Sequence, residues 1–111
     1  MERNENEVNR KQSDHNTFTW HDPYSTYVVI LEVDDGGKPV SVEYGSKTNW
    51  YSYHEDDEEF VGAVKKVMRT FLDYNMDEFK KMRKYLNMEY YEIAEEERRL
   101  AATRSSSEYD F

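Results

Sequence analysis

The chain has 111 residues and a mass of 13.4 kDa, which is the size of one domain and leaves no room for two independent cores. Acidic residues outnumber basic ones 24 to 15, and the formal net charge is -9, so we do not expect a chain packed along its whole length. Aromatic residues make up 15%, which is more than a fully disordered chain carries. The absence of cysteine excludes disulfides, thiolate metal sites and cysteine nucleophiles.

The two ends of the chain are polar and predict flexible segments around one domain. Residues 1–16 read as a flexible N-terminal arm, residues 17–102 as a single α+β domain, and residues 103–111 as a flexible acidic tail. The longest apolar stretch, residues 28–31, is far shorter than a membrane span, and the first residues lack an apolar signal region. We therefore expect a soluble cytoplasmic protein without a membrane partner.

Three segments between residues 24 and 54 show the period of two that is typical of β-strands. Residues 24–34 place Val29, Leu31 and Val33 on one face. Residues 34–38, with two adjacent glycines, suit a tight turn into a second strand that starts at Pro39. Residues 48–54 form a third run, and residues 17–20 are a candidate for a fourth, short strand. The pattern predicts a small antiparallel meander.

From residue 55 onward the apolar period changes to 3.6, which indicates helices. A stripe of apolar residues predicts a first helix, with the acids of residues 55–59 at its N-terminus, where negative charge favours the helix dipole. Asn75 and Glu78 have the spacing of a capping box, and a second helix is predicted from about Met76 toward Ala102. The predicted fold is thus an α+β domain, with the meander followed by two α-helices. The apolar positions of the two helices are Phe60, Val61, Val64, Val67, Met68, Phe71 and Leu72, then Phe79, Met82, Leu86, Tyr90 and Ile93.

Residues that could carry catalysis are few. His15, His21 and His54 lack the spacing of zinc ligands, and no glycine-flanked nucleophile turn or glycine-rich phosphate loop is present. A small, hydrophilic chain also leaves little volume for an apolar pocket. We therefore expect no enzymatic activity, no cofactor and no metal.

Carboxylates and neighbouring aromatic side chains are the leading candidates for a binding surface. Rows of carboxylates can stand where a nucleic-acid-binding protein expects phosphates, and an acidic surface steers association with a basic partner. Aromatic residues are enriched in the centres of protein interfaces. The candidate residues are Asp34, Asp35, Glu43, Trp50, Tyr51, Tyr53, Glu55, Asp56, Asp57, Glu58, Glu59, Glu89, Tyr91, Glu92, Glu95 and Glu96.

A cluster of basic residues supports an alternative. Residues 63–88 carry seven bases against three acids, and such a patch on the outward helix faces could hold phosphates. The net charge of -9 opposes nucleic-acid binding at long range, so only local segregation of charge would permit it. The residues of this alternative patch are Lys65, Lys66, Arg69, Lys80, Lys81, Arg83 and Lys84.

In size, acidity and lack of a catalytic motif, the chain resembles the small inhibitors that phages encode against restriction, CRISPR or repair nucleases. Its last four residues, Glu108-Tyr109-Asp110-Phe111, are similar to the acidic, phenylalanine-terminated tails with which single-stranded DNA-binding proteins recruit partners. The resemblance implies a protein partner, and no residue role is carried over from it.

Three functions remain open. The first is an acidic protein-binding module that inhibits a basic, nucleic-acid-handling protein by DNA mimicry. The second is a nucleic-acid-binding accessory protein that uses the basic helical face and recruits partners through its tail. The third is a structural protein that self-associates as a homodimer through the second helix. Binding to DNA or RNA that weakens steeply with salt would favour the second.

Overall fold

The computed structural model describes the backbone of residues 15–109 and the side chains of residues 16–103. The predicted N-terminal arm lies outside this range except for its last two residues, which belong to the first strand. Four antiparallel strands form one sheet in the order β1-β2-β3-β4, so the candidate fourth strand is confirmed. The strands are β1 (His15–His21), β2 (Val28–Asp34), β3 (Pro39–Gly45) and β4 (Trp50–His54).

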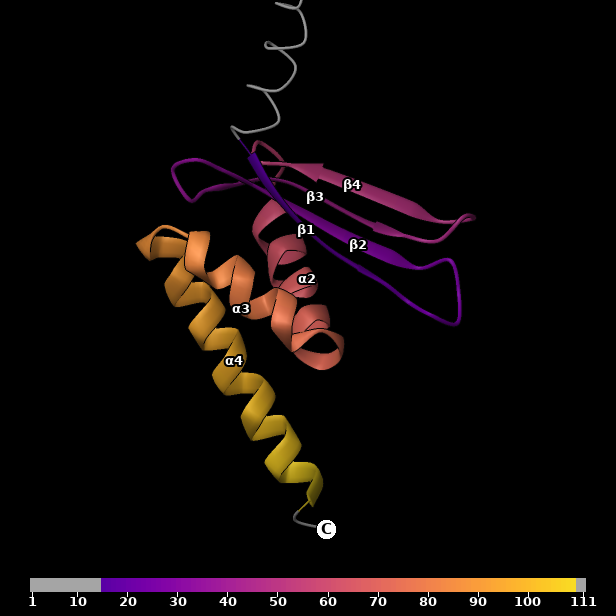
Figure 1. The fold of residues 1–111 in the computed structure, drawn as a ribbon, viewed down its shortest axis with the longest axis vertical. Helices are drawn as coiled ribbons and strands as arrows, with labels where there is room; N and C mark the ends of the chain where they lie inside the picture. Colours follow the sequence, from indigo (N-terminus) through magenta and orange to yellow (C-terminus); the bar gives the residue numbers. More distant parts are fainter. Residues whose placement is uncertain (1–14, 110–111) are drawn as a thin grey trace, which may run out of the picture.

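Three helices follow the sheet and lie on one side of it (Figure 1). They are α2 (Phe60–Tyr74), α3 (Met76–Tyr85) and α4 (Met88–Tyr109). Helix α2 packs beneath β2, β3 and β4, α3 packs against β1, and α4 packs on α2. The α+β class and the meander are therefore confirmed, with three helices in place of the predicted two.

The core lies between the sheet and α2, as the two periodicities predict. Leu31 of β2 and Val42 of β3 are fully buried, and the buried face of α2 includes Val64 and Phe71. Helix α3 adds Phe79, which is also fully buried. Burying a large apolar side chain contributes roughly 1.5–3 kcal/mol, so this layer is the main source of stability.

The predicted second helix is interrupted, which corrects the expectation of one helix from Met76 to Ala102. Leu86 has an extended backbone, with ψ of 144°, and ends α3. The Asn87 side chain then caps α4, because its Oδ1 accepts a hydrogen bond from the Tyr90 N–H at 3.0 Å. The Asn87 N–H donates to the Gly37 carbonyl at 2.8 Å. The break thus depends on a contact with a turn fifty residues earlier in the chain.

The capping box at the start of α3 is only half formed. Asn75 Oδ1 accepts from the Glu78 N–H at 3.3 Å, as the spacing predicts. The Glu78 carboxylate turns to the sheet instead, where Oε2 accepts from the Thr19 N–H at 2.9 Å. Glu78 therefore covers an unpaired donor on the β1 edge of the sheet.

Helix α4 continues through most of the predicted tail. Its backbone stays helical to Tyr109, and its second half extends away from the sheet (Figure 1). The predicted boundary at residue 102 is therefore not the end of the helix, and residues 110 and 111 lie outside the described range. Among the described residues, no helix has both the length and the apolar character that crossing a membrane requires.

Candidate protein-binding surface

The turn between β2 and β3 supplies the first carboxylates of the candidate surface. Asp34 Oδ1 accepts hydrogen bonds from the Gly36 N–H at 3.0 Å and from the Lys38 N–H at 2.9 Å, which fixes a tight turn. Gly37 has φ of 86°, a conformation that glycine adopts without steric cost. Asp35 is exposed at the tip of this turn.

Glycine is required at residue 37 for a second reason. A Cβ atom there would lie 2.4 Å from the Asn87 backbone nitrogen and 2.8 Å from the Tyr85 carbonyl oxygen. The turn can therefore approach the junction of α3 and α4 closely only because this side chain is absent. The contact places Glu89, in the first turn of α4, beside the β2–β3 turn.

The loop between β4 and α2 joins the same end of the molecule. Lys38 Nζ lies 3.0 Å from Glu55 Oε1, and the hydrogen bond with Glu55 raises the pKa of Lys38. Asp57 Oδ2 accepts from the His54 N–H at 2.8 Å, which turns the chain sharply after β4. The side chains of Asp56, Glu58 and Glu59 are exposed, and no ion pair joins them to another described residue.

These three segments form what we call the acidic end. Tyr90 lies close enough to all three segments for their charges to act on it. Burial raises its pKa, Glu89 of α4 and Glu55 of the loop raise it further, and Lys38 of the turn lowers it. Residues 55–59 lie at the N-terminus of α2, as predicted: Glu59 is the N-cap residue, and all five precede the first helical turn. The acidic end consists of Asp34, Asp35, Glu55, Asp56, Asp57, Glu58, Glu59 and Glu89.

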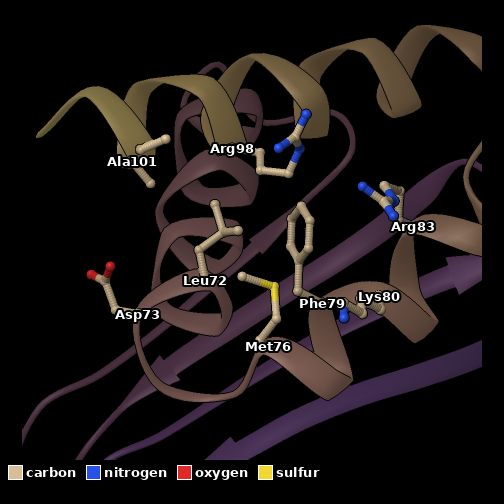
Figure 2. Close-up of a pocket in the computed structure, with 9 residues that line it drawn as sticks. Leu72, Asp73, Met76, Phe79, Lys80, Arg83, Arg98 and Ala101 are labelled. Carbon is tan, nitrogen blue, oxygen red and sulfur yellow. The ribbon is translucent and has the colours of Figure 1, made fainter. Parts of the chain in front are cut away.

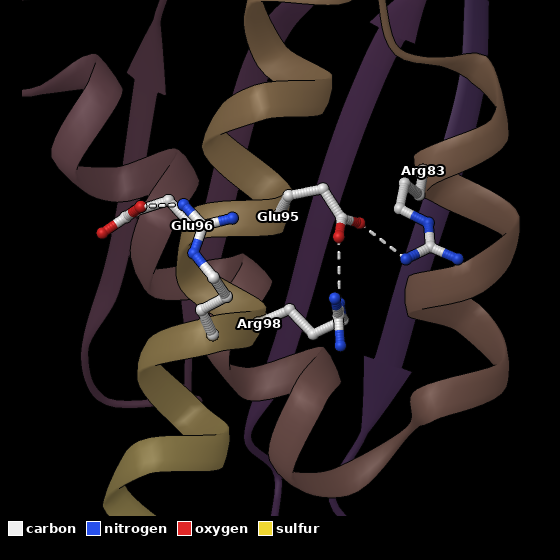
Figure 3. Close-up of polar contacts among 5 residues, drawn as sticks. Arg83, Glu95, Glu96 and Arg98 are labelled. Atoms are coloured by element: carbon white, nitrogen blue, oxygen red, sulfur yellow. Dashed lines mark hydrogen bonds and ion pairs between the residues drawn. The ribbon is translucent and has the colours of Figure 1, made fainter.

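A second run of acids, on α4, is occupied by arginines (Figure 3). Glu95 pairs with Arg83 at 2.6 Å and with Arg98 at 3.0 Å. Glu96 pairs with Arg99. The run lies about 10 Å farther along α4 than Met88, so the structure separates the candidates Glu95 and Glu96 from the acidic end.

Glu97 belongs to the same run of acids, and its role is structural. Its side chain is 3% exposed, and Oε1 accepts from Arg69 Nε at 2.8 Å, which ties α4 to α2. We call Glu95, Glu96 and Glu97 the α4 acid row. Of the remaining α4 candidates, Glu92 and Tyr91 are exposed, and Tyr91 lies 6.0 Å from the Arg83 guanidinium.

The aromatic candidates lie on the β4 edge, but on two faces of the sheet. The pairing register places Tyr51 and Tyr53 on the helix-covered face with Tyr44, whereas Trp50 lies on the opposite face. The Tyr44 ring contacts those of Tyr51 at 5.5 Å and Tyr53 at 6.0 Å. Burial and a hydrogen bond with Tyr53 raise the pKa of Tyr44 to about 12. Trp50 and Tyr51 are each 48% exposed.

The outer face of the sheet carries Glu43, which accepts from Ser52 Oγ at 3.4 Å. The three helices leave this face uncovered within the described part of the chain (Figure 1). The β4 edge is open in the same part, whereas Glu78 covers a donor on the β1 edge. Strand β4 leads directly into residues 55–59, so its last residue, His54, adjoins the acidic end, whereas Trp50 lies at its other end, level with Gly45 and Val28.

The basic candidates do not form one patch. Lys66 lies 5.3 Å from the Tyr44 ring centroid, on the β3–β4 side of α2. Helix α3, with Lys80, Lys81 and Lys84, lies against β1, at the opposite edge of the sheet from β4. Arg69 and Arg83 are held by Glu97 and Glu95, and Lys81 lies 3.4 Å from Glu78. Among these seven residues, Lys65, Lys66 and Arg69 share one depression of about 410 Å³.

The sequence predicts little volume for an apolar pocket, but the structure has two pockets with apolar side chains in their lining. A groove of about 590 Å³ lies between α4 and the α2–α3 corner, where Leu72, Met76 and Phe79 face Ala101 and Arg98 (Figure 2). A second pocket, of about 680 Å³, is lined mainly by aromatic side chains around the β1–β2 turn. The aromatic residues flanking the sequence Asp22-Pro23 were the signal that could have indicated it.

Metal ligands are not gathered anywhere in the described part of the chain, where no three histidine, aspartate or glutamate side chains form a suitable group. His21 and His54 end strands β1 and β4 and are exposed, and the side chain of His15 lies outside the described set.

Comparison with known proteins gave no relative. No protein-family model matches the chain, and neither the search of curated proteins nor the search of solved structures found a match.

Proposed function

We propose that this chain is a cytoplasmic protein-binding module that inhibits a basic, nucleic-acid-handling protein by occupying its nucleic-acid site. The convergence of three sequence-distant acidic segments at one end of the fold is the observation that carries the proposal. A backbone hydrogen bond between Asn87 and Gly37 and an ion pair between the side chains of Lys38 and Glu55 hold these segments together. The charge is therefore concentrated by the fold.

Electrostatics explains why such an end suits a basic groove. Carboxylates within a Debye length of each other, about 8–10 Å, add their potentials and steer a cationic partner toward them. A groove that binds phosphates presents lysines and arginines, which pair with carboxylates equally well. The acidic end would thus compete directly with the nucleic acid.

The β4 edge supplies the contacts that charge alone lacks. Trp50 and Tyr51 are half exposed and lie at the start of this open strand, whose other end leads into the acidic loop. Exposed tryptophan and tyrosine are the side chains that most often anchor interfaces. In this proposal, the acids set the rate of association and the aromatic edge slows dissociation.

The depression on α2 favours a second candidate, an accessory protein that binds nucleic acid. Lys65, Lys66 and Arg69 line it, and Lys66 stacks over an aromatic ring. The ion pair with Glu97 offsets the charge that Arg69 brings to the depression, so this candidate ranks below the first. An electrophoretic shift of duplex or single-stranded DNA at low salt, lost in Lys65→Ala/Lys66→Ala, would establish it instead.

Capture from a lysate of the native host tests the proposal. The immobilised wild type is compared with Asp56→Asn/Glu58→Gln/Glu59→Gln, which removes three loop charges without touching the Lys38–Glu55 pair. We expect the wild type to retain a nucleic-acid-binding protein that added duplex DNA displaces. The loop variant should retain about tenfold less of it, because steering changes association by that order or more.

A matched control removes the same number of charges elsewhere. Asp73→Asn/Asp77→Asn/Glu96→Gln changes exposed acids of α2, α3 and α4, and it should capture as well as the wild type. Equal loss in both variants would reduce the effect to net charge and contradict the proposal. Capture that DNA does not displace, or no specific capture at all, would also contradict it.

A further inference from the structure

An aromatic pocket lies at the end of the sheet opposite the acidic end. It opens at the turn between β1 and β2, has a volume of about 680 Å³, and is bordered by the last turn of α2. Pockets for small ligands span roughly 300–1,000 Å³, so its size fits one. The lining residues are Trp20, Asp22, Pro23, Tyr24, Tyr27, Thr70 and Tyr74.

Its rings are held in place by each other. Tyr74 stacks on Trp20 with centroids 4.9 Å apart, and Tyr27 meets Trp20 edge-on at 6.5 Å and 62°. The Trp20 and Tyr27 rings therefore form a corner. Tyr24 lines the pocket and is 93% exposed. The negative faces of aromatic rings attract cations, and because stacking covers one face of Trp20 and one of Tyr74, a cation would contact the remaining ring faces.

The aromatic faces are not already used by the protein's own cations. Three cation–π contacts occur among the described residues, and they involve Tyr44, Phe79 and Tyr91. None of the described lysines or arginines lies over Trp20, Tyr27 or Tyr74. Asp22 is the only charged side chain among the described residues that line the pocket, so a negative charge lies among its rings.

Asp22 supplies a ligand with negative charge, but both of its carboxylate oxygens already accept a hydrogen bond within the protein. Its Oδ1 accepts from the Tyr24 N–H at 2.9 Å, and its Oδ2 accepts from Ser25 Oγ at 2.9 Å. A primary ammonium would need three acceptors to replace its water, whereas a fully methylated ammonium donates no hydrogen bond. A ring corner with an engaged carboxylate therefore suits the methylated group better.

We propose that this pocket binds a methylated ammonium group, such as that of choline or of trimethylated lysine. The rings contact the methyl groups, and Asp22 compensates the positive charge. The site is independent of the acidic end, so its failure would leave the proposed function untouched.

The test is a two-dimensional NMR titration of the intact chain with choline. The chain has two tryptophans, so the Trp50 indole N–H is an internal control for Trp20. We expect millimolar binding that shifts the Trp20 signal and leaves Trp50 in place. The neutral isostere 3,3-dimethylbutan-1-ol has the same shape without the charge, and it should bind about tenfold more weakly. Equal binding of the two would overturn the proposal.

Variants separate the ring faces from the fold. Tyr74 is 67% exposed, so Tyr74→Ala should preserve the spectrum of the folded chain and weaken choline binding about fivefold. Tyr74→Phe, which keeps a ring, should bind as the wild type does, and Asp22→Asn should bind several-fold more weakly. Unchanged affinity in both Tyr74→Ala and Asp22→Asn would contradict the assignment.

Two ligands distinguish the sources of the group. A peptide with trimethylated lysine should bind more tightly than the same peptide with unmodified lysine, and the reverse order would overturn the proposal. Tighter binding of the peptide than of choline would support a protein side chain as the source. Tighter binding of choline would support a small molecule.

Discussion

Two runs of acids that look alike in the sequence behave differently in the structure. Residues 55–59 form an exposed loop in which only Glu55 makes an ion pair among the described residues. The α4 acid row is helical, and each of its three members pairs with an arginine. One run presents its charge to solvent, and the other pairs its charge with arginines, two on neighbouring helices and two on α4 itself.

The difference arises from the cations that the fold brings to each run. Arginines on α2 and α3 reach across to α4, and two more lie three residues along α4 itself. The loop follows a strand and precedes a helix whose first turn holds no cation, so among the described residues it pairs only with Lys38. A run of acids therefore indicates a binding surface only when the fold leaves it without arginines.

Helix α2 supports both regions, so damage to its core should have the largest effect. Phe71 is fully buried, and Phe71→Ala should lower the free energy of unfolding by about 3–5 kcal/mol. Leu31→Ala, on the facing strand, should cost about 2–5 kcal/mol. Urea denaturation measures both. An unchanged midpoint in either variant would contradict the core assignment.

Gly37→Ala should disrupt the acidic end selectively. The positive φ and the contact with Asn87 oppose any side chain, and together they should cost about 2–4 kcal/mol. Gly36→Ala is the matched control, because a Cβ there meets its nearest atom at 3.5 Å. Thermal melting of both variants checks the prediction. Equal melting temperatures for the two would show that the turn does not contact α4 as described.

The two acid runs should differ in their contribution to stability. Glu97→Ala removes a buried carboxylate, but its partner Arg69 is half exposed and can be hydrated, so we expect a loss of about 1–3 kcal/mol. Glu58→Ala, in the loop, should change stability by less than about 0.5 kcal/mol. Chemical denaturation of both variants tests the contrast, and similar losses would abolish it.

A smaller effect should appear in the pH dependence of stability. Burial of Glu95 acts to raise its pKa, but hydrogen bonds from Arg83 and Arg98 outweigh it, so the pKa lies below its ordinary value. A lowered pKa in the folded state gives stability that is present above the unfolded pKa, about 4.3, and lost as pH falls through the folded value.

Glu95→Gln should therefore be less stable than the wild type near neutral pH, with the difference shrinking below about pH 4. Denaturation curves across this range measure it, and Glu58→Gln serves as the comparison. A difference that stays constant with pH would mean that ionised Glu95 does not stabilise the helix pair.

Much of the fold could be predicted because it depends on local periodicity. Alternation in residues 28–34 gave the central strand, and the 3.6-residue stripe gave α2. The break at Asn87 was missed: no glycine or proline marks it, asparagine as an N-cap was the one local signal, and the contact with Gly37 forms only in the folded chain. The hydrogen bond from the Thr19 N–H to the Glu78 carboxylate could not be predicted either, because it is a tertiary contact.

The candidate surface was predictable in composition more than in arrangement. Charge counts pointed to residues 55–59 as an exposed acidic segment, and the structure leaves them exposed. They could not reveal which acids are paired, because Arg69 and Glu97 lie 28 residues apart in sequence. The aromatic pocket was missed for the same reason, since Trp20 and Tyr74 meet only in the folded chain.

The central claim is that the acidic end, and not the α4 acid row, is available to a basic partner. An NMR titration of the intact chain with an oligolysine peptide at low salt tests it most directly. We predict that the amides of the acidic end shift first and that added salt reverses the shifts, whereas those of Glu95, Glu96 and Glu97 stay in place. Larger or earlier shifts in the α4 acid row would contradict the account.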